Sequence, residues 1–171
     1  MANIVAATIK LLKTTEPQDV TLRDVALESG HGHRLIVEWF GGKGGLFAAV
    51  FQEIFESLLQ TGEFYLSDVV VRPEVRTAFK VFNYMQMHHP EFVKEVRTGK
   101  FIQAVENRLV SGLGLSTDRA RLVAKRIAVS AIGISLFIDY FDLTQNEAIQ
   151  MIRDEFKLMT GHDMPTRPGV E

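Results

Sequence analysis

Apolar residues recur every three or four positions along most of the chain, which is the spacing of amphipathic helices. The first such run places four apolar residues on one face: Ile4, Ala7, Leu11 and Leu12. The widest run follows Lys43 and continues to Leu59, so we expect that helix to be buried on more than one side. No convincing strand pattern and no internal repeat interrupts this spacing. The pattern therefore predicts an all-α fold.

Capping residues predict where several helices begin and end. Thr21, with Asp24 three positions later, is typical of a capping box, and Ser29-Gly30 would end that helix. Thr144 and Glu147 repeat the same start before a last helix that ends at Gly161. The other predicted helices cover residues 32–39, 73–87, a short stretch from 90, 100–109 and 117–141.

Composition and charge exclude several classes of protein. The chain has 171 residues and 46% hydrophobic residues, which is enough for a packed core and too many for disorder. It has no cysteine, so disulfides are excluded. Its formal net charge of −2 does not by itself indicate nucleic-acid binding. The longest uncharged stretch, 127–138, is well short of the ~20 residues of a membrane span. We expect a cytoplasmic protein that needs no cofactor and binds no membrane.

The stretch HGHRLIVEWFGGKGG, residues 31–45, combines paired histidines with a glycine-flanked lysine. A phosphate loop is excluded because Val37 and Gly44 stand where that loop needs a glycine and a hydroxyl. A metal site is not indicated either. His31 and His33 are two positions apart and do not share a helix face. A metal site assembled from residues far apart in the sequence stays open.

The order of elements around this stretch favours a third interpretation. A helix, a short capped helix, a tight turn and a second short helix form a helix-turn-helix within a three-helix head. The second short helix would then be the recognition helix. His31, Gly32, His33 and Arg34 lie at its N-terminal end, where side chains meet base edges. Lys43 opens the following helix, where a lysine and free backbone N–H groups favour a phosphate.

The segment TLRDVALESGHGHRLIVEWFGGKGGLFAAVF resembles the helix-turn-helix signature of the TetR (tetracycline repressor) family of transcriptional regulators. The resemblance covers about 4–51, and its matching positions are Thr21, Arg23, Asp24, Ala26, Gly30, Trp39, Phe40, Lys43 and Leu46. It implies a homodimeric repressor that a small apolar effector releases from a palindromic operator in double-stranded DNA. The residues expected to contact DNA are Thr21, Arg23, His31, Gly32, His33, Arg34, Trp39 and Lys43.

Three departures from the family pattern keep other functions open. Val37 replaces a common tyrosine, Glu38 is acidic, and Gly44 and Gly45 stand where helix formers are usual. Five basic and five acidic residues cancel over 1–45. A ligand sensor or partner-binding protein with weak or lost DNA binding is therefore the alternative. An enzyme is not expected, because no recognisable nucleophile–base set, metal motif or nucleotide loop is present.

The second part of the chain predicts an effector site and a dimer surface. Aromatic residues and methionine suit an adaptable cavity, although ordinary core packing explains most of them. The effector candidates, chosen from spacing, are Phe79, Phe82, Met85, Phe101, Val105 and Phe137. Small and apolar residues at helical spacing on the last two helices suggest a four-helix dimer interface. Its candidates are Ala124, Ala128, Ala131, Ser135, Ile149, Ile152 and Phe156.

These assignments divide the chain into three parts. Residues 1–45 form the DNA-binding head, 46–161 form the effector-binding and dimerisation domain, and 162–171 form a flexible tail. Homodimerisation would place two heads on one operator.

Overall fold

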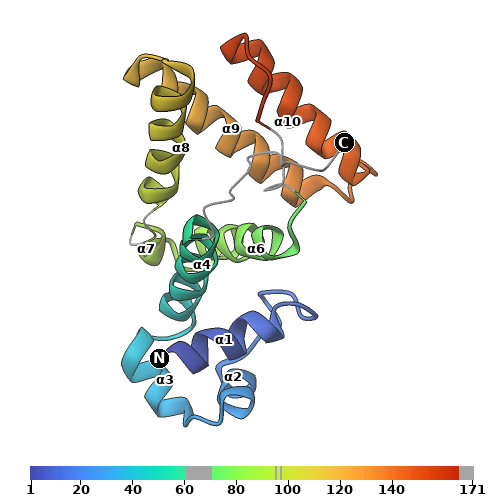
Figure 1. The fold of residues 1–171 in the computed structure, drawn as a ribbon. Coiled ribbons are helices and arrows are strands. Elements are labelled where there is room, and N and C mark those ends of the chain that lie inside the picture. The colour runs from blue at the N-terminus through green and yellow to red at the C-terminus, as the bar shows by residue number, and fades with distance from the viewer. Residues whose placement is uncertain (61–70, 95, 97, 166–171) are drawn as a thin grey trace. The chain divides into compact units, whose positions relative to one another are not determined.

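The structure is a computed structural model that describes residues 1–60, 71–94, 96 and 98–165, with 60 and 98–101 described in backbone only (Figure 1). Every regular element in these ranges is a helix, which confirms the all-α prediction. The helices are α1 (Ala2–Leu11), α2 (Leu22–Ser29), α3 (His33–Phe40), α4 (Lys43–Gln60), α6 (Pro73–His88), α7 (Pro90–Val93), α8 (Thr98–Leu113), α9 (Thr117–Phe137) and α10 (Gln145–Thr160).

The predicted caps of α2 and α10 are confirmed. Thr21 Oγ1 accepts a hydrogen bond from the Asp24 N–H (3.2 Å), and Asp24 Oδ2 accepts one from the Thr21 N–H (3.0 Å). Thr144 and Glu147 form the same reciprocal pair at 3.2 and 2.8 Å. At the other ends, α2 stops at Gly30 and α10 at Gly161, both in the left-handed conformation that glycine adopts readily.

Two helix boundaries differ from the predictions. The helix predicted to reach 141 ends at Phe137, and the chain then turns through residues 138–142, where Asp142 has φ +52°. Helix α8 is longer than the predicted 100–109 and ends before Gly114, which has φ +65°. Hydrophobic spacing fixes the middle of a helix better than its ends, because the end depends on local turn geometry.

The chain folds into two compact units. Unit 1 comprises Met1–Ser57 and Thr77–Arg97, and unit 2 comprises Leu58–Arg76 and Thr98–Glu171. Unit 1 thus holds α1–α3, α7 and most of α4 and α6, whereas unit 2 holds α8–α10. The functional division at residues 45 and 161 remains a prediction, because a compact unit is not evidence of a function.

The core of unit 1 joins the first three helices to α4 and α6. Helix α2 packs on both α1 and α3. The fully buried side chains of this core include Ile4, Val20, Val25, Ile36, Leu46 and Phe47. Aromatic rings line the contact between α4 and α6: Phe51 lies 5.3 Å from Phe82, and Phe55 lies 5.7 Å from Phe79, between ring centres.

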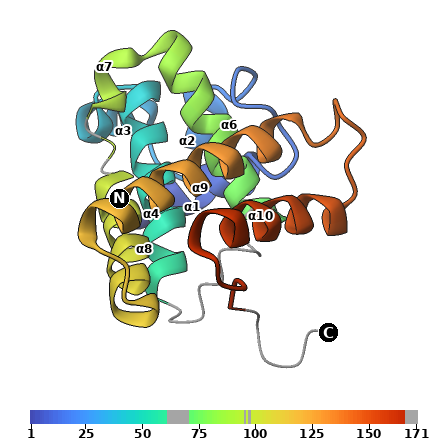
Figure 2. The ribbon, with the colours of Figure 1, turned by 90° about the horizontal axis from the view of Figure 1, so that it is seen from above.

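In unit 2, α9 packs against both α8 and α10. Both ribbon views show α10 running alongside α9 (Figures 1 and 2). The buried side chains include Ala120, Val123, Ile127, Ala148, Ile152 and Phe156. Ion pairs border this core: Arg121 binds Glu106 at 3.2 Å, and Arg126 binds Glu155 at 2.9 Å. None of the described helices combines the length and hydrophobicity needed to cross a membrane.

Candidate nucleic-acid interface

Helix α3 presents a continuous outward arc of side chains. Ile36 and Phe40 are buried against the rest of unit 1 and fix one face of the helix. The side chains on the opposite arc are exposed: His33, Arg34, Val37 and Glu38. The apolar pair at i and i+4 therefore orients the polar residues of α3 toward solvent.

The N-terminal end of α3 is open. Its N-cap is Gly32, which has no side chain to accept a hydrogen bond from the first turn. The N–H groups of Leu35 and Ile36 bond to the Gly32 carbonyl, and the earlier ones stay outside the helix ladder. Uncapped N–H groups and the positive end of the helix dipole together favour an anion such as a phosphate.

His31 and Trp39 lie next to each other at one side of this end. Their ring centres are 6.3 Å apart, and His31 Nδ1 lies 2.8 Å from the carbonyl oxygen of Ser29. The Ser29 contact holds the His31 ring against the turn after α2. Trp39 is 39% exposed and shares α3 with Arg34. The structure thus brings two of the aromatic candidates for DNA contact together.

Thr21 and Arg23 lie at the start of α2 and are both exposed. The Thr21 hydroxyl lies 2.6 Å from Asp24 Oδ2 and is engaged in the capping box. The hydrogen bonds from the Thr21 hydroxyl and backbone N–H hold the pKa of Asp24 below its ordinary value. Asp24 therefore keeps its negative charge beside two of the predicted phosphate contacts.

Lys43 is folded against its own unit. Its Nζ atom donates a hydrogen bond to the Gln18 carbonyl oxygen (3.1 Å). The same ammonium lies 4.7 Å from the centre of the Tyr84 ring and 5.3 Å from that of Phe47. Tyr84 was not predicted, because it comes from α6, far along the chain, and no local pattern links it to Lys43.

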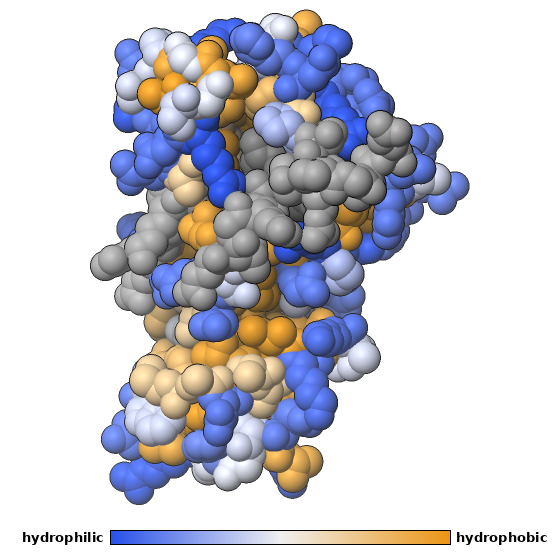
Figure 3. Space-filling model, viewed as in Figure 1, coloured by the Kyte–Doolittle hydropathy of each residue, from blue (hydrophilic) through white to orange (hydrophobic). Residues whose placement is uncertain are grey.

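Unit 1 contains two lysine–glutamate ion pairs among its described residues. Lys10 binds Glu28 at 2.5 Å, and Lys80 pairs with Glu16. Among the described residues, Arg34 and Glu38 have no ion-pair partner, although they are four positions apart on α3. Hydrophilic and hydrophobic residues lie side by side over α2 and α3 (Figure 3). The exposed arc therefore carries one free cation and one free anion.

The six effector candidates are divided between the two units. Phe79, Phe82 and Met85 lie on α6 in unit 1, and Phe79 and Met85 are buried. Val105 and Phe137 belong to unit 2, where Val105 is buried and Phe137 is 53% exposed. The side chain of Phe101 lies outside the described residues. Phe79 and Phe82 form the aromatic contact with Phe55 and Phe51 of α4.

Most of the dimer candidates are core residues of unit 2. Five of the seven are buried within the single chain: Ala124, Ala131, Ser135, Ile152 and Phe156. Ala128 and Ile149 are partly exposed. These five side chains are therefore packed within the chain itself. The large apolar residues exposed on α9 and α10 are Leu122, Val129, Phe137, Met151 and Leu158.

The described residues contain no cluster of three or more histidine, aspartate, glutamate or cysteine side chains placed to hold a metal ion. No protein-family model matches the chain, and no curated protein matches it in sequence.

Solved structures of similar fold are numerous. A TetR transcriptional regulator from Rhodococcus sp. RHA1 matches with a TM-score of 0.62 and 16% identity, over 92% of this chain and 93% of that one. A TetR-family transcriptional regulator from Streptomyces coelicolor matches with a TM-score of 0.61 and 18% identity, over 94% and 96%. The transcriptional regulator FadR from Bacillus subtilis, in complex with stearoyl-CoA, matches with a TM-score of 0.55 and 14% identity, over 93% and 97%.

These matches extend over nearly the whole chain and define its fold as that of an all-helical transcriptional regulator. More narrowly, it is the fold of the TetR regulators, as the sequence of the first helices indicated. At 14–18% identity the likeness is one of fold, and function must be argued from the residues themselves.

Proposed function

We propose that this protein is a homodimeric DNA-binding transcriptional regulator, a repressor that a small-molecule effector releases from a palindromic operator. The observation that carries this proposal is the open N-terminal end of α3, with Arg34 and His33 exposed beside it. Buried Ile36 and Phe40 hold this end outward. The structural neighbours, which are transcriptional regulators of the TetR type, support it.

In this proposal α3 enters the major groove. Arg34 pairs with the edge of a guanine, which is the most common specific contact of an arginine. His31, Gly32 and His33 approach neighbouring bases at the same end of the helix. The phosphate contacts come from Thr21, Arg23, Trp39 and Lys43, which fix the register of the protein on the duplex.

A dimer is needed because one short helix reads only a half-site. Two recognition helices about one turn of DNA apart, ~34 Å, would match a palindrome. We assign the subunit contact to the exposed apolar residues of α9 and α10, chiefly Leu122, Val129, Met151 and Leu158. Buried Phe156 and Ile152 support these helices from within the chain. The partly exposed Ala128 and Ile149 fit the edge of the contact.

The effector is proposed to be a small apolar molecule bound by the region after the head. Release follows if the effector binds more tightly to a conformation that fits the operator poorly. The neighbour FadR, which has the same fold, was solved in complex with stearoyl-CoA, and this supports a ligand-binding role for the region. The functional parts are then a head at 1–45, an effector-binding and dimerisation region at 46–161 and a tail at 162–171.

One observation favours a second candidate function. Glu38 lies unpaired on the same exposed arc as Arg34 and would face the DNA backbone. Phosphate contacts supply much of ordinary DNA affinity, and the basic residues of the head are balanced by acidic ones. A TetR-like ligand sensor or partner-binding protein with weak DNA affinity is the alternative that this charge pattern supports.

Selection from random duplex DNA separates the two functions. The dimeric protein is incubated with the pool at low salt, and the bound DNA is sequenced. Arg34→Ala removes the proposed base contact, whereas Lys13→Ala removes one positive charge from outside α3 and serves as the matched control. Enrichment of a palindrome that Arg34→Ala weakens and Lys13→Ala preserves supports the regulator. No enrichment by a folded dimer overturns it in favour of the sensor.

A further inference from the structure

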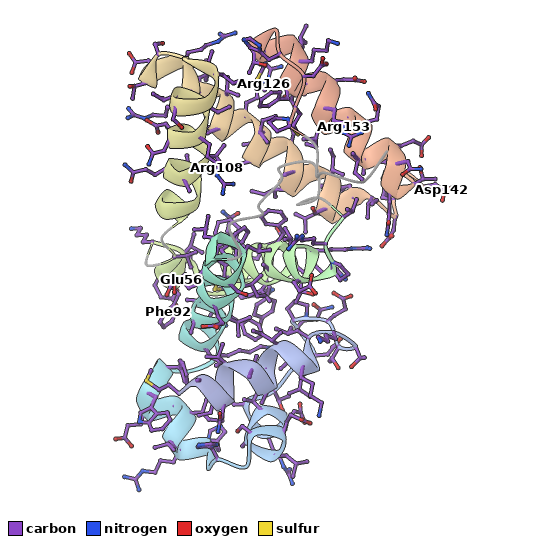
Figure 4. The ribbon with its side chains drawn as sticks, in the orientation of Figure 1. Glu56, Phe92, Arg108, Arg126, Asp142 and Arg153 are labelled. Atoms are coloured by element: carbon purple, nitrogen blue, oxygen red, sulfur yellow. The ribbon has the colours of Figure 1, made fainter. Side chains whose placement is uncertain are left out.

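Phe92 of α7 lies against the junction between α3 and α4. A Cβ atom on Gly44 would come 2.5 Å from Phe92 Cδ2, and one on Gly45 would come 3.1 Å from Cε1. A Cβ on Gly41 would come 3.8 Å from Cζ of the same ring. The ring thus covers three of the four glycines at the turn from one helix to the next. Figure 4 labels Phe92 where α7 approaches the first turn of α4.

The glycines differ in why they are needed. Gly41 has φ +71°, a left-handed backbone conformation that by itself favours glycine at this position. Gly45 is already required by the Phe40 carbonyl oxygen, which a Cβ would meet at 1.8 Å. Gly44 has neither reason, because its φ is not positive and its close neighbours are side chains from beyond α6.

Glycine is therefore needed at position 44 because α7 and the residue before it lie so close. A glycine inside a helix is less favourable than an alanine. Here it leaves room for Phe92 and for His89, whose Cβ would lie 2.9 Å from a Cβ on Gly44. The Gly44-Gly45 pair departs from the usual family pattern after the lysine. In this chain the Phe92 ring packs against both glycines. The glycines and the ring form one contact.

Helix α7 is a short helix of unit 1. It spans four residues, none of them buried, and Phe92 itself is half-buried. The Phe92 ring lies against Gly41, the C-cap of α3, and against Gly44 and Gly45 in the first turn of α4. After Val93 the chain leads on to α8, which belongs to unit 2. Phe92 is thus held at the junction that sets the direction of α3.

We propose that Phe92 is a positioning residue for DNA recognition: its ring, seated on Gly41, Gly44 and Gly45, fixes the angle between the recognition helix α3 and α4. The inference rests on the proposed DNA-binding function. Bidentate contacts to base edges have narrow geometry, so a tilt of α3 would weaken operator binding although Phe92 touches no DNA. The seat is a specific property of this chain, because it depends on glycine at 44.

The test compares Phe92→Ala, Gly44→Ala and the double variant with two controls. Phe141→Ala removes an exposed phenylalanine from unit 2, and Gly112→Ala adds a methyl group to a helical glycine with open space around it. The readouts are hydrogen exchange of residues 33–46 and affinity for the selected operator, corrected for the folded fraction by circular dichroism. That correction separates positioning from a loss of stability.

We expect Phe92→Ala and Gly44→Ala each to weaken operator binding about tenfold and to raise exchange in residues 33–46. The double variant should lose no more than either single variant, because both changes act on one contact. Both controls should match the wild type. Wild-type affinity and exchange in Phe92→Ala and in Gly44→Ala would overturn the proposal.

The exchange readout keeps this result separate from the proposed function. If the wild-type dimer selects no DNA, the regulator proposal fails, whereas raised exchange in residues 33–46 still supports the positioning of α3 by Phe92. Unchanged exchange in the same variants overturns the positioning whether or not DNA binds. If Phe92→Ala does not fold, Phe92→Leu, which keeps part of the apolar contact, is measured instead against Gly44→Ala.

Discussion

The Nζ atom of Lys43 lies 4.7 Å from the centre of the Tyr84 ring. A lysine ammonium over an aromatic face is attracted to it by about 0.5–1 kcal/mol at partly exposed sites. The same ammonium bonds to the Gln18 carbonyl oxygen, and a third donor direction remains available. The residue that the TetR resemblance assigns to a phosphate is therefore held in place before any DNA is present.

This relationship predicts two different effects. Lys43→Ala should reduce the slope of log affinity against log salt by about one, because one phosphate contact is lost. Tyr84→Leu should leave the slope unchanged and lower the affinity by roughly threefold, because the lysine loses the ~0.5–1 kcal/mol that holds it in place. Both are measured by fluorescence anisotropy over a salt series. An unchanged slope in Lys43→Ala would remove Lys43 from the interface.

Glu38 gives the proposal a test by gain of affinity. Replacing its unpaired carboxylate with the neutral Glu38→Gln should raise DNA affinity about three- to tenfold at low salt, with a smaller gain as salt rises. Arg34→Ala should do the reverse. Glu53→Gln, an equal charge change at an exposed position of α4, is the control and should change affinity little. If Glu38→Gln binds no more tightly, Glu38 does not face the DNA.

The two capping boxes allow matched stability measurements in the two units. Thr21→Ala and Thr144→Ala each remove the side-chain acceptor of one helix start and should cost about 1 kcal/mol of unfolding free energy. Only Thr21→Ala should also weaken DNA binding, because its hydroxyl lies at the proposed interface. Urea unfolding and operator titration measure the two effects. Equal loss of DNA binding in both variants would show that the Thr21 hydroxyl at the start of α2 does not contact DNA.

Stability should fall at acid pH through the same boxes. The Thr21 side chain and N–H lower the pKa of Asp24, and the Thr144 N–H and side chain lower that of Glu147. A native pKa below the unfolded one adds stability that is complete above the unfolded values of 3.8 and 4.5 and is lost as pH falls through the native ones. Melting temperatures between pH 7 and pH 3 should show this drop, and both Thr→Ala variants should reduce it.

Two residues of α10 separate the core from the proposed dimer surface. Phe156 is 1% exposed and Leu158 is 81% exposed. Leu158→Asp should convert the dimer to a monomer with little change in the helical content of each chain. Phe156→Ala should cost about 3–5 kcal/mol by leaving a cavity. Light scattering and thermal unfolding distinguish these outcomes. A dimer that survives Leu158→Asp would place the subunit contact elsewhere.

The sequence by itself determined the class of the fold and many helix ends. Thr21, Gly30, Thr144 and Gly161 mark boundaries that the structure confirms, because a cap is decided by residues within one turn of each other. The exposed arc of α3 follows from the same short-range pattern, since the buried Ile36 and Phe40 at i and i+4 leave the other face for the polar residues.

The tertiary structure alone decided what covers each apolar face. Phe156 and Leu158 are both apolar residues of the amphipathic helix α10, but only the packing of α9 beside α10 shows which one is buried in the chain. The seat of Phe92 on Gly44 was equally out of reach, because that contact joins residues with no local pattern between them. Short-range periodicity fixes which way a side chain faces relative to its own helix. The partner on that side is fixed by packing between distant segments.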